Sequence, residues 1–172
     1  YLALNVSSPN TQGLRDLQSR EYLSALFASL KRGREALRER YARDVKLVLK
    51  VSPDLDDAAL GDIAEVARRE RADGLIATNT TVSHAGLDHL PHGTEEGGVS
   101  GAPLTAPSTE VLRKFARLLK GEVPLIACGG VMSAADARAK FDAGAALVQL
   151  YSGLVYRGPR LVAECVDVAR TS

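Results

Sequence analysis

Five short apolar runs constrain the fold of this chain more than any other feature of its sequence. The runs do not alternate apolar with polar residues, so we expect strands that are buried on both faces. A segment with helical spacing of apolar residues follows each run, and this alternation predicts a parallel sheet covered by helices. The five runs are residues 1–6, 46–51, 74–78, 124–128 and 146–150.

The intervening segments carry helix signals. Leu23, Phe27 and Leu30 recur at helical spacing, and Asp56 and Ser133 are typical N-cap residues. Residues 82–107 are instead rich in Gly, His, Pro and Thr, and loops of this length in compact domains are usually functional. The expected helices span about residues 19–40, 56–67, 111–119, 133–144 and 161–169.

Two architectures fit five strand–helix units: an open doubly wound sheet and a TIM (β/α)8 barrel. The chain starts inside a strand pattern, without Met or a leader segment. We therefore expect residues 1–172 to be the C-terminal portion of a single α/β barrel domain, its last five or so strand–helix units out of eight. In that case the segment alone should be inactive without its upstream half.

Composition excludes several classes of function. A formal net charge of +1 provides no basic field that would attract nucleic acid. No apolar run reaches the roughly 18 residues needed to cross a bilayer. His84, His89 and His92 lie at irregular spacing in the loop-like segment, so we expect exposed loop histidines and no metal site.

Polar residues or glycines follow all five runs. In a parallel barrel the carboxyl ends of the strands meet at one mouth, where active sites are built. The sequence therefore predicts one site at this mouth. Its residues are Asn5, Ser8 and Asn10 after the first run, Lys50 in the second, Thr78, Asn79 and Thr80 at the third, Gly129 and Gly130 after the fourth, and Tyr151 and Ser152 after the fifth.

Lys50 is the most informative of these residues because it interrupts an apolar strand. An unpaired ammonium there would be costly, although its stem could extend from the strand end into water. The functional interpretation is a fixed cation that faces an anionic ligand or a developing negative charge. Gly129-Gly130 and the turn after Tyr151 follow the last two strands, where barrels commonly bind phosphate through backbone N–H groups.

Six ordered blocks of this sequence resemble the dihydroorotate dehydrogenase family, specifically its membrane-associated, quinone-linked class 2. The resemblance runs through essentially the whole chain. The blocks are NVSSPNTQGLR (residues 5–15), KVSPDL (50–55), ATNTT (77–81), GGVSGAPL (97–104), CGGV (128–131) and GAALVQLYSG (144–153).

The resemblance implies an FMN-binding (β/α)8 barrel that oxidises (S)-dihydroorotate to orotate in pyrimidine synthesis. It implies that Ser8 is the catalytic base, and serine instead of cysteine at this position points to the quinone-linked class. The positions that match substrate-binding residues are Asn5, Asn10, Asn79 and Thr80. The positions that match FMN contacts are Asn5, Lys50, Thr78, Gly101, Gly130, Tyr151 and Ser152.

The resemblance also implies a quinone electron acceptor and peripheral membrane association through an upstream segment absent from this chain. The Ala- and Arg-rich composition favours the cytoplasmic face of a bacterial inner membrane over a mitochondrial one. Two alternatives are another FMN barrel reductase of pyrimidine rings, such as a tRNA-dihydrouridine synthase, and a non-enzymatic phosphate-binding barrel. The weak net charge and Ser8 disfavour the first, and the second leaves Lys50, Ser8 and Asn79 without a shared purpose.

Overall fold

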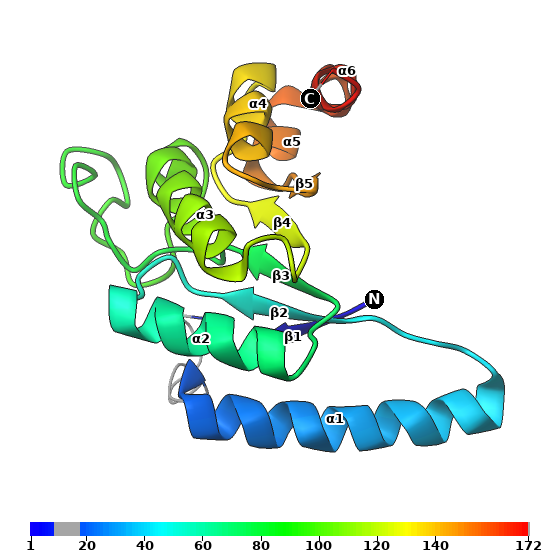
Figure 1. Cartoon of the computed structure of the whole chain (residues 1–172). Helices are drawn as coiled ribbons and strands as arrows, with labels where there is room; N and C mark the ends of the chain where they lie inside the picture. Colours follow the sequence, from blue (N-terminus) through cyan, green and yellow to red (C-terminus); the bar gives the residue numbers. More distant parts are fainter. Residues whose placement is uncertain (9–17, 172) are drawn as a thin grey trace.

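The computed structural model describes residues 1–8 and 18–171, and this part of the chain contains all five expected strands (Figure 1). They form one parallel sheet in which each strand pairs with the next in the sequence, in the order β1-β2-β3-β4-β5. The strands are β1 (Leu2–Asn5), β2 (Leu47–Val51), β3 (Gly74–Ala77), β4 (Leu125–Cys128) and β5 (Leu147–Gln149).

The expected helices are also present, and two of the predicted caps are confirmed. Asp56 accepts a hydrogen bond from the Ala59 N–H at 2.8 Å, and Ser133 accepts one from the Asp136 N–H at 3.2 Å. The helices are α1 (Arg20–Tyr41), α2 (Asp57–Arg69), the 3₁₀ helix η2 (Ala102–Leu104), α3 (Thr105–Leu119), α4 (Ala134–Asp142), α5 (Ser152–Arg157) and α6 (Arg160–Ala169).

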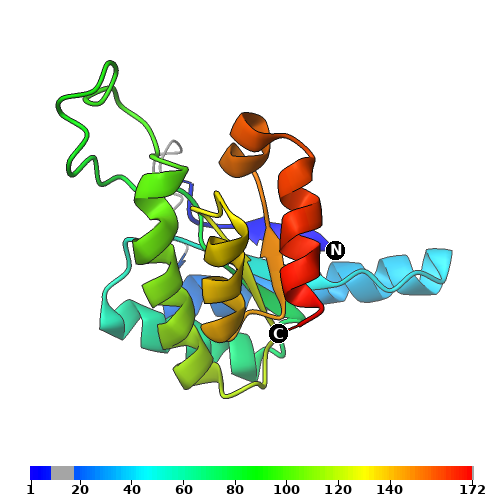
Figure 2. The ribbon, with the colours of Figure 1, turned by 90° about the horizontal axis from the view of Figure 1, so that it is seen from above.

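The helices cover one face of the sheet, as Figures 1 and 2 show. Consecutive helices contact each other in the series α1, α2, α3, α4 and α6. Strand residues such as Leu49, Leu75 and Ala127 pack with helix residues in the main core. Their neighbours Val48, Ile76 and Ile126 point to the opposite face and form a small cluster of their own, which includes no helix residue. We call this second face the inner face.

The sheet curls around its inner face. Strands β1 and β5 lie at opposite edges of the sheet, yet the Gln149 Nε2 donates a hydrogen bond to the Tyr1 hydroxyl at 2.5 Å. A doubly wound sheet reverses its strand order and carries helices on both faces. Sequential order, outer helices and inward curvature are instead the geometry of a (β/α)8 barrel. The described strands therefore form part of such a barrel.

Two segments differ from their predicted structure. The loop predicted over residues 82–107 ends earlier, because η2 begins at Ala102 and α3 at Thr105. Pro107 lies in the first turn of α3, where a missing N–H is tolerated because that N–H has no intrahelical partner. Helix α5 was not predicted, since its six residues are too few to show helical periodicity.

None of the helices in the described part of the chain combines the length and apolar character needed to cross a lipid bilayer.

Candidate functional site

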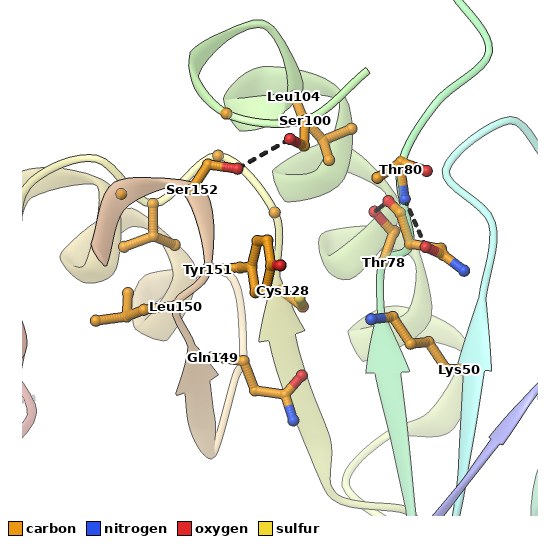
Figure 3. A pocket seen from close by; sticks show the side chains of 16 residues that line it. Lys50, Thr78, Thr80, Ser100, Leu104, Cys128, Gln149, Leu150, Tyr151 and Ser152 are labelled. Carbon is orange, nitrogen blue, oxygen red and sulfur yellow. Dashed lines mark hydrogen bonds between the residues drawn. The ribbon is translucent and has the colours of Figure 1, made fainter. Parts of the chain in front are cut away.

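A cavity of about 480 Å³ lies at the carboxyl ends of β2 to β5 (Figure 3). Strand-end residues from four consecutive strands line it, together with residues of the loop that precedes α3. The convergence predicted from the sequence is therefore present for these four strands. The lining residues are Lys50, residues 78–80, Ser100, Gly101, Leu104, residues 128–131 and residues 149–153.

Lys50 reaches this cavity from the inner face of β2. Alternation along the strand places Lys50 on the same side as Val48, and Figure 3 shows its nitrogen directed into the cavity. In the described part of the chain no carboxylate forms an ion pair with Lys50 within 4.0 Å. Among the described residues the cavity thus contains a cation without a counter-ion, which suits an anionic ligand.

Ser7 joins the ends of three strands. Its hydroxyl is fully buried and donates to the Lys50 carbonyl at 2.9 Å. It also accepts from Asn79 Nδ2 at 3.1 Å, and the same Nδ2 donates to Asn5 Oδ1 at 3.0 Å. These bonds fix the side chains of Asn5 and Asn79 beside each other. Ser7 was not predicted as a site residue, although its position between the predicted residues Asn5 and Ser8 was a usable signal.

Ser8 follows in the same loop and is half-buried, but it is not among the residues that line the cavity. Asn5 likewise lies outside the lining set and reaches the cavity through its hydrogen bond with Asn79. Asn10 lies outside the described residues. The roles assigned to Ser8, Asn5 and Asn10 therefore remain predictions.

The loop after β3 is held by its own side chains and by a carboxylate from the loop after β2. Asn79 Oδ1 accepts from the Thr80 N–H at 2.9 Å. Asp54 accepts from the Val82 N–H at 3.0 Å and from the Thr81 hydroxyl. This role of Asp54 was not predicted, because nothing in the sequence alone pairs Asp54 with a segment 27 residues away.

The Gly129–Gly130 turn requires glycine on both steric and conformational grounds. Its φ angles are +106° and +73°, and a Cβ on Gly130 would lie 2.3 Å from Thr105 Cα. The Thr105 hydroxyl donates to the Gly130 carbonyl at 2.5 Å. The N–H groups of Gly130 and Val131 donate to no acceptor in the described chain. The turn therefore offers two backbone donors at the cavity wall, which suits a phosphate group.

Ser100 and Gly101 meet the turn after β5 at the cavity rim. The hydroxyls of Ser100 and Ser152 are 2.9 Å apart and share a hydrogen bond (Figure 3). A Cβ on Gly101 would lie 3.7 Å from that of Ser152. The structure thus brings the predicted positions Gly101, Tyr151 and Ser152 to one side of the cavity.

Cys128 and Gln149 line the cavity but were not predicted as site residues. Burial raises the pKa of the Cys128 thiol, while the positive charges of Lys50 and Lys140 act in the opposite direction. The Cys128 thiol is therefore protonated at neutral pH and is not a thiolate nucleophile.

The histidine-containing loop is organised by His84. Its Nδ1 lies 2.7 Å from the Gly93 carbonyl and its Nε2 lies 3.2 Å from the Gly97 carbonyl. Both partners are acceptors, so both ring nitrogens donate only when the ring is protonated. Among the described residues, no group of three or more His, Cys, Asp and Glu side chains is placed to hold a metal ion.

The chain is similar to known proteins both in sequence and in fold. The family model described as dihydroorotate dehydrogenase matches residues 1–169. The chain is 50% identical to the dihydroorotate dehydrogenase (quinone) of Flavobacterium lutescens over 99% of its length, and 51% identical to that of Akkermansia muciniphila over the same share. Each match covers 49% of the relative, so the chain spans about half the length of the curated relatives it matches.

A solved structure of DHODH from Eimeria tenella in complex with ferulenol superposes with a TM-score of 0.91 at 37% identity. The superposition covers 97% of this chain and 48% of that one. A ligand-free structure from the same organism gives a TM-score of 0.89 at 38% identity.

Gly130→Ala should destabilise the turn and weaken binding of phosphate-containing ligands. The added Cβ collides with Thr105 backbone atoms, and alanine disfavours a φ of +73°. We expect a loss of about 1–3 kcal/mol in unfolding free energy, measured by denaturant titration of the full-length protein. Gly61→Ala is the matched control, because Gly61 lies within α2 and a Cβ added there contacts no atom beyond its own helix. This substitution should raise the unfolding free energy by about 0.5–1 kcal/mol. Equal effects of the two substitutions would contradict the steric account.

The loop of residues 84–97, which His84 holds through hydrogen bonds to Gly93 and Gly97, should open more readily as the pH rises. Hydrogen bonds to the Gly93 carbonyl and then to the Gly97 carbonyl raise the pKa of His84 above its ordinary value of 6.5. A raised folded-state pKa contributes stability that is complete below the unfolded pKa and is lost as the pH passes the folded pKa. Limited proteolysis should cut residues 84–97 faster at pH 8 than at pH 6, and His84→Ala should abolish this difference. Exposed His89→Ala is the control and should retain it.

Proposed function

Because the chain belongs to the dihydroorotate dehydrogenase family, we propose that this protein oxidises (S)-dihydroorotate to orotate in pyrimidine synthesis. FMN would supply the hydride acceptor when bound, and a quinone would reoxidise it. The observation that carries this proposal is the convergence of four consecutive strand ends on one cavity, whose wall holds a lysine that pairs with no carboxylate of the described chain. The family assignment favours this reaction over a tRNA-dihydrouridine synthase or a non-enzymatic phosphate-binding barrel.

The cavity fits a flavin mononucleotide by the chemistry of its donors. Gly130 and Val131 offer N–H groups for the phosphate, since neither donates to an acceptor in the described chain. Lys50, which also lines the cavity, offers a cation that would offset the negative charge that hydride transfer places on the N1–C2=O edge of a flavin. The remaining residues proposed to hold FMN are Asn5, Thr78, Gly101, Tyr151 and Ser152.

Asn5, Asn10, Asn79 and Thr80 are the residues that we propose to bind the substrate. The ring edge of orotate resembles a peptide amide, and a carboxamide side chain both donates to and accepts from such an edge. Asn79 Nδ2 gives both its hydrogens to Asn5 and to the buried Ser7, so the orientation of Asn79 is fixed before any ligand arrives. Its Oδ1 accepts from the Thr80 N–H and retains a second lone pair for a ring N–H of the substrate. A preorganised amide pays less entropy on binding than a free one.

Ser8 is the proposed base that takes the proton from C5 of the substrate while the hydride leaves C6. A serine hydroxyl is a poor base near neutral pH, so Ser8 must pass the proton on through a hydroxyl or water relay. Pro9 directly follows Ser8 in the sequence and restricts its backbone. The loop that contains Ser8 and the loop that contains His84 are the proposed lids that exclude water from the reaction.

The proposed electron acceptor is a quinone, which the names of both bacterial relatives specify for those proteins. A quinone dissolved in a bilayer requires the enzyme to rest on the membrane surface. We propose that a segment upstream of this chain supplies that contact, on the cytoplasmic face of a bacterial inner membrane. The proposed partners include no nucleic acid.

The full-length protein should purify yellow, and its visible flavin absorbance should bleach when dihydroorotate is added without oxygen. A quinone added afterwards should restore the absorbance. A colourless protein, or a bound flavin that dihydroorotate leaves oxidised, would overturn the proposed function.

Ser8→Ala should slow anaerobic flavin reduction by about 10²–10⁴-fold, the range of a lost general base, while FMN stays bound. Lys50→Ala should differ by weakening both FMN retention and flavin reduction, because it removes a cation from the cavity wall. Stopped-flow absorbance gives the reduction rate, and the flavin content of the purified variants gives retention. A Ser8→Ala variant that is reduced at the wild-type rate would rule out the proton-accepting role.

A further inference from the structure

Lys140 is a fully buried lysine that lies outside the cavity lining, on α4 behind the Gly129–Gly130 turn. Its ammonium donates to Ser108 Oγ at 2.6 Å, to Thr109 Oγ1 at 2.7 Å and to the Thr105 carbonyl at 3.2 Å. All three acceptors belong to the first turn and a half of α3. The ammonium thus has a complete set of hydrogen bonds, and every partner is formally neutral.

No carboxylate in the described chain forms an ion pair with Lys140. Asp136 precedes it by one turn of α4, but that carboxylate accepts from the Met132 N–H at 3.0 Å and from the Ser133 hydroxyl at 2.8 Å. A buried charge without a counter-ion is expensive, and an apolar side chain of the same size is usually more stabilising. Burial lowers the pKa of Lys140 to about 8, so the side chain is still charged in most molecules at neutral pH. Packing of α3 on α4 alone does not require a lysine here.

The hydrogen bonds of Lys140 lead directly to the glycine turn. Ser108 Oγ accepts from the ammonium, and its own hydrogen is shared between the Leu104 carbonyl at 2.6 Å and the Gly129 carbonyl at 3.0 Å. Thr105, whose carbonyl accepts from Lys140, donates through its hydroxyl to the Gly130 carbonyl at 2.5 Å. Two successive carbonyls of the turn are therefore held on the side of α3. The unbonded N–H groups of Gly130 and Val131 remain at the cavity wall.

The charge of Lys140 also extends to the cavity. It acts, like that of Lys50, to lower the pKa of Cys128, whose side chain lines the cavity. A phosphate monoester carries a charge of about −1.5 to −2 at pH 7. Such a group at the glycine turn would be the counter-ion that Lys140 lacks among the described residues, with the turn and Ser108 between them.

We propose that Lys140 is a positioning residue for the phosphate of the bound flavin nucleotide, acting through Ser108 and the Gly129–Gly130 turn. This inference rests on the proposed function, since it assumes that the cavity binds FMN. Lys140 acts from behind the turn by its charge and by the hydrogen bonds that orient the turn.

The test compares FMN with riboflavin, which has the same ring system without the phosphate. Apoprotein of the full-length enzyme is titrated with each ligand, and binding is followed by flavin fluorescence. In Lys140→Met we expect the Kd for FMN to rise at least about tenfold while the Kd for riboflavin changes less than about twofold. Lys114→Met is the matched control, because Lys114 lies on α3 in an exposed ion pair with Asp57 of α2, and its loss should leave both constants unchanged.

Equal losses for FMN and riboflavin in Lys140→Met would mean that Lys140 only supports packing, and this result would overturn the inference. Unchanged binding of both ligands would overturn it as well. Ser108→Ala keeps the charge and removes the hydroxyl that links it to the turn, so it should lower the preference for FMN in the same direction. If Lys140→Met does not fold, the Ser108→Ala variant decides, and an unchanged preference for FMN refutes the proposal.

The two proposals fail in distinguishable ways. A wild-type apoprotein that binds neither flavin would overturn both. A wild-type enzyme that binds FMN and is bleached by dihydroorotate, with variants that keep the preference for FMN, would overturn the role of Lys140 alone.

Discussion

Parallel pairing of strands in sequential order is the constraint on which the rest of the structure depends. It places the carboxyl end of every strand at the same edge, and it forces the connecting helices to one face. The inner face is then free of helices, so a side chain such as Lys50 can face a cavity without crossing a packed layer. The buried hydroxyl of Ser7 refines this arrangement by linking three strand ends through hydrogen bonds.

The electrostatics of the cavity follow from two lysines placed on different elements. Lys50 lies in its wall, and Lys140 lies behind the glycine turn between α3 and α4. In the described chain neither lysine has a carboxylate partner. The two lysines therefore leave an excess of positive charge near the cavity before a ligand binds. Two hydroxyls and a carbonyl accept hydrogen bonds from the Lys140 ammonium and stabilise it in its buried position. Because these acceptors are neutral, they do not neutralise the positive charge.

Local sequence patterns were sufficient to predict the strands and most of the helices, because burial on both faces gives β2, β3 and β4 an unbroken apolar composition. The polar strand ends were predictable for the same reason, since Lys50 and Thr78 interrupt or end such runs. The edge strands β1 and β5 have the same composition but are exposed or half-buried, so the expectation of burial on both faces was wrong for them. Ser7, Asp54 and Lys140 were missed because their roles depend on partners 27 to 72 residues away. Lys140 in particular occupies a helix with several charged residues, where a lysine ordinarily indicates an exposed surface.

The hydrogen bond between Tyr1 and Gln149 joins residues that are 148 positions apart, whereas each strand pairs with the next one along the chain. Sheet pairing therefore demands the closure of one strand–helix unit at a time, and such closures are entropically modest. The contact across the interior brings together the most distant parts of the described chain and depends on all the intervening units being in register. The curvature that this contact marks therefore depends on the summed pairing of all five strands, and so does the shape of the ligand cavity that the curved sheet encloses.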